Sequence, residues 1–162
     1  MPSAQFFVWR VLINKVPTRD NINNRGVRLG SNTCALCAIT NETVSHLFFT
    51  CKVTTRIWQL CDSWIGRSFV YHNSAGIYFS QFELIGLGNK HNNVWRCMWL
   101  AIVWDIWNHR NKVIFRNAKV EAEEVFMLAQ TKVWAWITNK YSMATFSYSD
   151  CCLCPITGLL IL

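Results

Sequence analysis

The 162-residue sequence has few acidic residues, and this scarcity argues against several classes of enzyme. Its four aspartates are Asp20, Asp62, Asp105 and Asp150. No two of them are adjacent, whereas a polymerase needs clustered aspartates to hold two divalent ions. The glutamates within 121–124 stand where a helix would begin, and acidic side chains there interact favourably with the helix dipole. We therefore expect no polymerase or ribonuclease H centre.

Other signatures of catalysis and targeting are also missing. The sequence has no glycine-rich phosphate loop and no Ser-His-Asp arrangement. The most apolar run, 97–104, is bounded by Arg96 and Asp105, and it is far shorter than the roughly 20 residues that span a membrane. No basic region precedes a long apolar stretch at the N-terminus, as a secretory signal would require. We predict a non-catalytic intracellular protein without a membrane anchor, in the nucleus or the cytoplasm.

The composition nevertheless favours a folded, basic protein. Hydrophobic residues make up 52% of the chain and charged residues 15%, and there are nine tryptophans. Such a chain can build a core and is not disordered by composition. The formal net charge of +7 favours acidic partners, RNA or DNA first, although a basic protein that binds nothing would have the same charge.

The most informative stretch is CALCAITNETVSHLFFTC, residues 34–51. It contains Cys34, Cys37, His46 and Cys51 with the spacing C-x2-C-x8-H-x4-C. Thiolate and imidazole are zinc ligands, and three cysteines with one histidine fill a tetrahedral site completely. Because no position is left for water or substrate, the pattern predicts a structural zinc ion. Ordinary buried cysteines, or a disulfide between Cys34 and Cys37, are the alternatives.

The residues around this stretch carry a resemblance. The segments FFVWRVLINKVPTRDNINNRGVRL, CALC, NETVSHLFFTC and RIWQLCDSW resemble the zinc-binding domain of plant LINE-type reverse transcriptases, over about residues 6–65. The matching residues are Phe7, Trp9, Arg10, Val16, Pro17, Thr18, Arg25, Gly26, Cys34, Cys37, Glu42, Thr43, His46, Leu47, Phe48, Cys51 and Trp58. Ile22 departs from the usual Leu of this family, and Lys52 from the common Pro. A later segment, WNHRNKVIFRN, resembles W-x-x-R-N-x-x-x-F of the same elements.

This resemblance implies an accessory module of a retroelement protein, since the family domain usually lies between the polymerase and a ribonuclease H domain. Two functions are open. The first is a zinc module that binds nucleic acid weakly through a basic patch, which we define as Arg10, Lys15, Arg19, Arg25 and Arg28. The second is a structural module that bridged the two enzyme domains and whose partners are other retroelement domains. A solvated helix face would explain the basic patch equally well.

The hydrophobic periodicity predicts a mostly α fold: a small zinc-knuckle-containing helical domain, a linker and two long helices. We place the zinc-binding domain at 4–65, the linker at 66–91 and the helical extension at 92–140. Helices are expected at 4–16, 19–25, 53–64, 93–115 and 121–139, with a short amphipathic one at 77–87. Cys61 lies on an apolar stripe and is interpreted as a core residue.

The last part of the chain, 141–162, loses this periodicity, and we predict a disordered tail. Cys151, Cys152 and Cys154 lie in it, but no neighbouring residue completes a metal site with them. Their role, the oligomeric state and the preference for RNA or DNA are not determined by the sequence.

Overall fold

The computed structural model describes residues 2–66, 68, 70–83, 86, 88–140 and 147–153. Its helices are α1 (Pro2–Leu12), α2 (Arg19–Asn23), the π-helical turn η1 (His46–Thr50), α3 (Lys52–Ile65), α4 (Ala75–Gln81), α5 (Asn89–Arg116), α6 (Ala122–Lys140) and α7 (Tyr148–Leu153). Within these ranges the backbone forms no strand, and Thr33 and Asn41 form an isolated bridge. The predicted mostly α fold is confirmed, including its two long helices.

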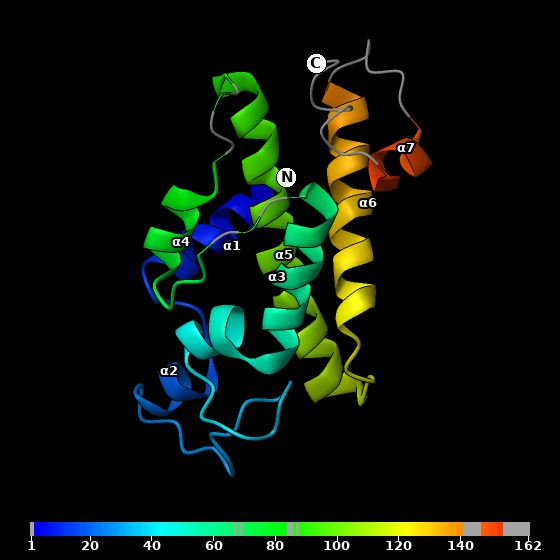
Figure 1. The fold of residues 1–162 in the computed structure, drawn as a ribbon. Coiled ribbons are helices and arrows are strands. Elements are labelled where there is room, and N and C mark those ends of the chain that lie inside the picture. The colour runs from blue at the N-terminus through cyan, green and yellow to red at the C-terminus, as the bar shows by residue number, and fades with distance from the viewer. Residues whose placement is uncertain are drawn as a thin grey trace.

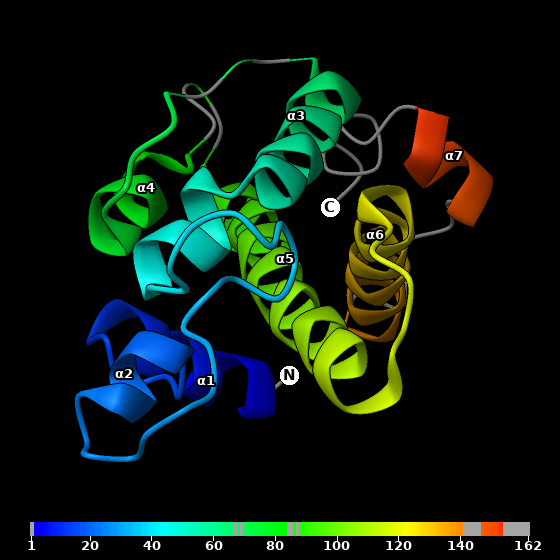
Figure 2. The ribbon, with the colours of Figure 1, turned by 90° about the horizontal axis from the view of Figure 1, so that it is seen from below.

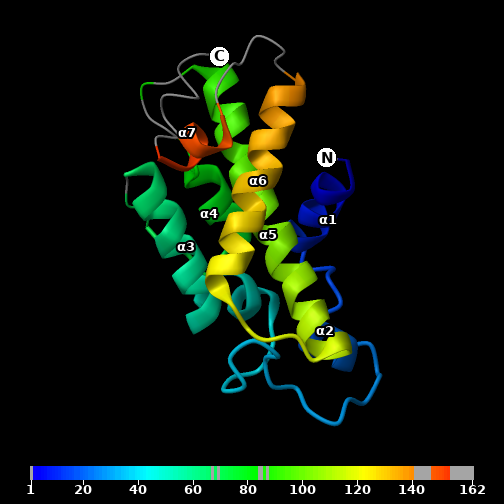
Figure 3. The same cartoon turned by 90° about the vertical axis from the view of Figure 1, so that its right-hand side faces the viewer.

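Helix α5 is the axis of the molecule. In Figure 1 it runs the length of the structure beside α6, and Figure 2 shows it enclosed by α1, α3 and α6. Helix α5 packs against both α1 and α6, while α3 packs against α6 and η1. Figure 3 shows that the C-terminal end of α5 reaches the end of the molecule where α2 and the loop before η1 lie. The N-terminal region and the two long helices therefore pack together around α5.

One aromatic core joins these elements. The indole rings of Trp58 in α3 and Trp99 in α5 are both fully buried, with centroids 6.2 Å apart. Phe49 of η1 stacks on both, at 6.4 Å from Trp58 and 6.1 Å from Trp99. Tyr78 and Phe82, which follow α3 in the chain, belong to the same cluster. Their ring centroids lie 4.9 and 6.0 Å from that of Trp58. A large share of the hydrophobic free energy of folding therefore comes from residues far apart in sequence.

Local signals set the helix boundaries. Thr18 accepts a hydrogen bond from the backbone of Asn21 and caps α2. Helix α1 ends at Leu12, earlier than the predicted 16, because Asn14 adopts a left-handed conformation with φ of 53° ahead of Pro17. Gly66 caps α3 with φ of 69°, a value that glycine adopts without strain.

The predicted linker and tail both contain structure. Helix α4 lies within 66–91, earlier than the expected 77–87, and it buries Tyr78 in the core. In the segment predicted as a tail, Tyr148–Leu153 form α7, which packs on α6 and buries Cys151. The remaining tail residues, including Cys154, lie outside the described residues. The division into a domain at 4–65 and an extension at 92–140 stays a prediction, but the two parts share a core.

Among the described residues, no helix has the length and apolarity needed to cross a membrane.

The shared core gives a stability prediction. Trp99→Ala should lower the free energy of unfolding by about 3–5 kcal/mol, because it leaves a cavity where Phe49, Trp58 and Phe79 meet. Urea denaturation followed by circular dichroism measures the change. Phe6→Ala is the control, since that ring is 61% exposed and should cost little. An unchanged midpoint for Trp99→Ala would contradict a core shared between η1, α3 and α5.

Candidate metal centre

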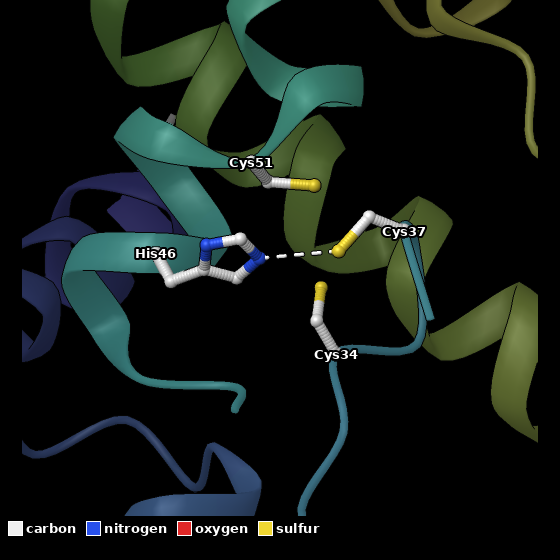
Figure 4. Close-up of side chains that lie close together, drawn as sticks. All are labelled: Cys34, Cys37, His46 and Cys51. Carbon is white, nitrogen blue, oxygen red and sulfur yellow. Dashed lines mark hydrogen bonds between the residues drawn. The ribbon is translucent and has the colours of Figure 1, made fainter. Parts of the chain in front are cut away.

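The four predicted metal ligands come together in the structure. One ligand atom from each of Cys34, Cys37, His46 and Cys51 lies within 4.8 Å of every other one. Figure 4 shows the three sulfur atoms and the edge of the His46 ring converging on one point. All three cysteines are buried and His46 is partly buried, so a bound ion would be largely shielded from water. No other group of metal-binding type is found in the part of the chain that the structure describes.

A tight loop presents the first two ligands. The Cys34 amide donates to the carbonyl of Thr40 at 2.7 Å, and the Ala38 amide donates to the carbonyl of Cys34 at 2.9 Å. The bridge between Thr33 and Asn41 closes the loop at its base. Ala38 has φ of 56°, a left-handed conformation that costs a residue with a Cβ about 1–2 kcal/mol. The turn that brings Cys37 back over Cys34 is therefore held by backbone bonds against local strain.

The π-helical turn presents the other two ligands. The Cys51 amide donates to the carbonyl of His46 at 2.8 Å, which makes an i to i+5 bond. This wider turn brings the residue five positions later back over the first, so that both side chains reach the same point. Of the four residues between them, Leu47, Phe48 and Phe49 are buried and Thr50 is exposed. The x4 spacing thus serves two purposes, because it aligns two ligands and anchors the site in the core.

The donor set and its geometry fit zinc. In a tetrahedral site with Zn–S bonds of about 2.3 Å, neighbouring ligand atoms lie roughly 3.5–3.8 Å apart. The observed limit of 4.8 Å and the 3.3 Å between Cys37 Sγ and His46 Nε2 bracket that range. Small side-chain rotations would suffice to close the shell around an ion. The cluster can hold a metal, and soft sulfur with imidazole is the donor set of structural zinc.

Hydrogen bonding and burial shift the pKa values of two of the thiols. A hydrogen bond between them raises the pKa of Cys34 well above its usual value, and burial raises it further. The same bond lowers the pKa of Cys51. Only the thiolate binds zinc, so metal binding to thiol groups releases protons to the solvent.

Two threonines complete the surroundings of His46 and were missed by the sequence reasoning. The Thr50 hydroxyl lies 3.4 Å from Nδ1 of the ring, and the Thr40 hydroxyl lies 3.2 Å from Nε2. A histidine that binds a metal through one nitrogen usually donates its other N–H to an oxygen. With Nε2 facing the sulfur atoms, Thr50 is placed to accept from Nδ1. Hydroxyl residues at 40 and 50 gave no signal because threonine is common on surfaces.

A buried carboxylate connects the metal loop to two helices. Glu42 is fully buried and accepts from the backbone amides of Arg19 and Ala35 at 3.1 and 3.3 Å. It also accepts two bonds from the Arg110 guanidinium of α5, at 2.5 and 3.2 Å. Arg110 lies over the ring of Trp107, 4.8 Å from its centroid. Glu42 therefore joins the start of α2, the residue after Cys34, and α5.

The basic patch does not supply the side-chain partner of this carboxylate, and its residues lie in more than one place. Glu42 pairs with Arg110, whereas Arg25 donates to the Lys15 carbonyl at 3.4 Å. Arg10 donates to the same carbonyl at 3.0 Å. Arg19 lies elsewhere and donates to the carbonyl of Ser31 at 3.3 Å. None of the five basic residues forms an ion pair with a carboxylate in the described ranges.

Two other cysteines of the described residues, Cys61 and Cys151, are separate from this centre. Cys61 is fully buried in α3, and burial raises its thiol pKa well above the usual value, which confirms its interpretation as a core residue. Cys151 is buried in α7, where burial raises its pKa to about 11. A thiol that stays protonated in an apolar environment suits a packing residue better than a metal ligand.

Substitution of a single cysteine should distinguish the metal ligands from the cysteines of the core. Cys34→Ser is expected to lose zinc and to behave like protein stripped with a chelator, because metal binding and local folding share one free energy. Cys61→Ser should keep one zinc per chain. Metal content by mass spectrometry and thermal unfolding with and without chelator measure both effects. A zinc-free wild-type protein with an unaffected Cys34→Ser variant would rule out the site.

The Glu42–Arg110 pair gives a second prediction. Glu42→Gln should lower the free energy of unfolding by about 3–5 kcal/mol, because it leaves Arg110 buried without its counter-charge. A double variant, Glu42→Gln with Arg110→Met, should recover part of this loss. Urea unfolding of the three proteins measures it. Glu124→Gln is the control: its ion pair with Lys112 is exposed and should be worth about 1 kcal/mol or less. Equal costs for the buried and the exposed pair would refute the assigned role.

Comparison with known proteins concerns the N-terminal part of the chain. No curated protein and no solved structure gives a significant match. Residues 1–58 match the family model described as zinc-binding in reverse transcriptase. The match runs from α1 to Trp58 and includes all four clustered ligands, so two independent observations fall on the same residues. The first 58 residues of this chain are therefore similar to the zinc-binding domain of reverse transcriptases.

Proposed function

We propose that the chain is a non-catalytic zinc-binding module derived from a plant LINE-type reverse transcriptase, and that it binds nucleic acid weakly. The observation that carries the proposal is the convergence of Cys34, Cys37, His46 and Cys51 inside the segment that matches the zinc-binding family. The zinc ion has a structural role, since the four protein ligands leave no position for substrate. The family description supports an accessory domain without a polymerase or nuclease centre.

The metal centre cannot itself attract phosphate. Three thiolates outweigh the two positive charges of zinc, so the filled site carries about −1 with a neutral His46. Attraction to nucleic acid then depends on the basic patch. Its guanidinium and ammonium groups lack carboxylate partners among the described residues, and Lys15, Arg25 and Arg28 are exposed. Few phosphate contacts of this kind give non-specific dissociation constants of about 10⁻⁴–10⁻⁶ M at physiological salt.

A second function is favoured by a different surface. Helix α1 exposes Phe6, Trp9 and Leu12, with exposed fractions of 61%, 54% and 38%, and Ile13 directly after it is 42% exposed. These residues follow helical spacing and form one apolar face, with the Phe6 and Trp9 rings 5.9 Å apart. Such a face suits a structural module that docks on another retroelement domain. The protein would then bridge the polymerase and ribonuclease H domains and need not bind nucleic acid.

A salt titration distinguishes the two functions. We expect wild-type protein to lose affinity for a labelled oligonucleotide steeply as salt rises, whereas docking through the α1 face would respond weakly. Arg25→Ala with Arg28→Ala should reduce the slope of log K against log salt by roughly one unit per lost phosphate contact, without changing base preference. Fluorescence anisotropy at several salt concentrations measures both quantities.

Arg56→Ala is a matched control for this experiment. Its guanidinium already pairs with Glu123 at 3.1 Å, so its removal should leave the slope almost unchanged. The Arg25 bond to Lys15 is long, and thermal unfolding should show the double variant folded. A folded double variant with wild-type affinity and slope would contradict the basic patch and favour the bridging module.

A further inference from the structure

One aromatic residue of α5 lies outside the core. Phe115 is 75% exposed, the most of any phenylalanine in the described part of the chain, and it lies one residue before the end of the helix. Trp107 in the same helix packs on Phe7 with ring centroids 5.4 Å apart and is partly buried, unlike Phe115. An exposed phenyl ring gains nothing from folding.

Two hollows flank this ring, and Phe115 lines both. The larger, with a volume of about 510 Å³, lies between α5 and α6, with Asn108, Lys112 and Leu128 in its walls. The smaller, with a volume of about 330 Å³, lies between α5 and the α2 region, with Ile22, Leu29, Gly30 and Ser31 in its walls. Phe115 therefore stands as a ridge between two depressions at one end of the molecule.

The charges around this ridge are predominantly positive. Arg19 lines the smaller hollow, and Lys112, Arg116 and Lys132 line the larger one. Lys132 is neutralised by Asp105, and Lys112 lies 3.6 Å from Glu124. Arg19 and Arg116 form no ion pair within the described ranges, so each hollow keeps one uncompensated guanidinium. Arg116 also offsets the partial negative charge of the α5 C-terminus.

We propose that single-stranded nucleic acid crosses this end of the molecule, with one base stacked on Phe115 and phosphates near Arg19 and Arg116. This proposal rests on the nucleic-acid binding of the proposed function and gives it a specific site. An exposed aromatic ring between basic groups is the arrangement by which proteins bind single strands without sequence preference. Duplex bases are stacked on each other and have no face free for the ring. The paired hollows give room for the nucleotides before and after the stacked base.

Charge distinguishes this surface from the apolar face of α1. Phe6 and Trp9 of α1 form an aromatic pair without a cation over either ring in the described structure, which suits a protein partner. Trp9 also precedes an arginine, but the guanidinium of Arg10 donates to the Lys15 carbonyl at 3.0 Å. Phe115 precedes Arg116 and lines the smaller hollow together with Arg19. We therefore expect substitution of Phe115, and not of Phe6, to weaken nucleic-acid binding.

The test compares Phe115→Ala with Phe6→Ala in the full chain loaded with zinc. The probe is a short fluorescein-labelled oligouridine, followed by anisotropy, and an abasic strand of the same length is the second ligand. Phe115→Ala should weaken oligouridine binding by about 5- to 150-fold, the range measured for loss of one base stack. Phe115→Trp should retain the affinity, and Phe6→Ala should match wild type. Because Phe115 is exposed, its loss should leave the melting temperature unchanged.

The abasic strand isolates the stacking contribution. Wild type should bind it more weakly than oligouridine, and Phe115→Ala should bind the two strands equally. If wild type binds oligouridine and Phe115→Ala binds it just as well, the stacking site is wrong while nucleic-acid binding stands. If wild type binds neither strand at low salt, the nucleic-acid function itself fails. A weaker Phe6→Ala with an unchanged Phe115→Ala would move the site to α1.

Discussion

The buried ion pair between Glu42 and Arg110 is the constraint on which the rest of the structure depends. Removing both charges from water costs several kcal/mol per ion, and only close, multiply bonded geometry repays this cost. The carboxylate here accepts two bonds from Arg110 and two from the backbone amides of Arg19 and Ala35. Each of these donors comes from a different segment. The pair therefore favours one arrangement of the metal loop, α2 and α5 over its alternatives.

This pair also bears on what the zinc-binding unit includes. The family match ends at residue 58, yet Glu42 inside the match needs Arg110 outside it. The aromatic core extends the same dependence, because Trp58 and Phe49 pack on Trp99 of α5. A fragment ending near residue 65 would leave a buried carboxylate without its counter-charge and expose several aromatic rings. The physical unit consequently includes α5, whatever the boundaries suggested by sequence similarity.

Sequence reasoning identified the features that depend on neighbours along the chain. The four ligands were found because their spacing alone defines a chelating pattern, and the two long helices because their apolar residues repeat with the helical period. The partner of Glu42 was not found, since it lies 68 residues away and many arginines were available. The helix expected at 77–87 is observed at Ala75–Gln81, because tertiary contacts with Trp58 and Trp95 determine where Tyr78 and Phe82 lie. Such contacts leave no local pattern from which the helix ends could be predicted.

The metal and the surface at the end of α5 are connected through the same carboxylate. Zinc would cross-link the loop of Cys34 and Cys37 to η1, and Ala35 in that loop donates to Glu42. The other side of the carboxylate holds the Arg19 amide, which fixes the start of α2 beside the hollow next to Phe115. The filled site, in which three thiolates surround the ion, has the wrong net charge to attract phosphate. Its contribution to nucleic-acid binding would be geometric, because it holds the loop that orients the carboxylate, and the carboxylate holds Arg19 and Arg110 on the two sides of that hollow.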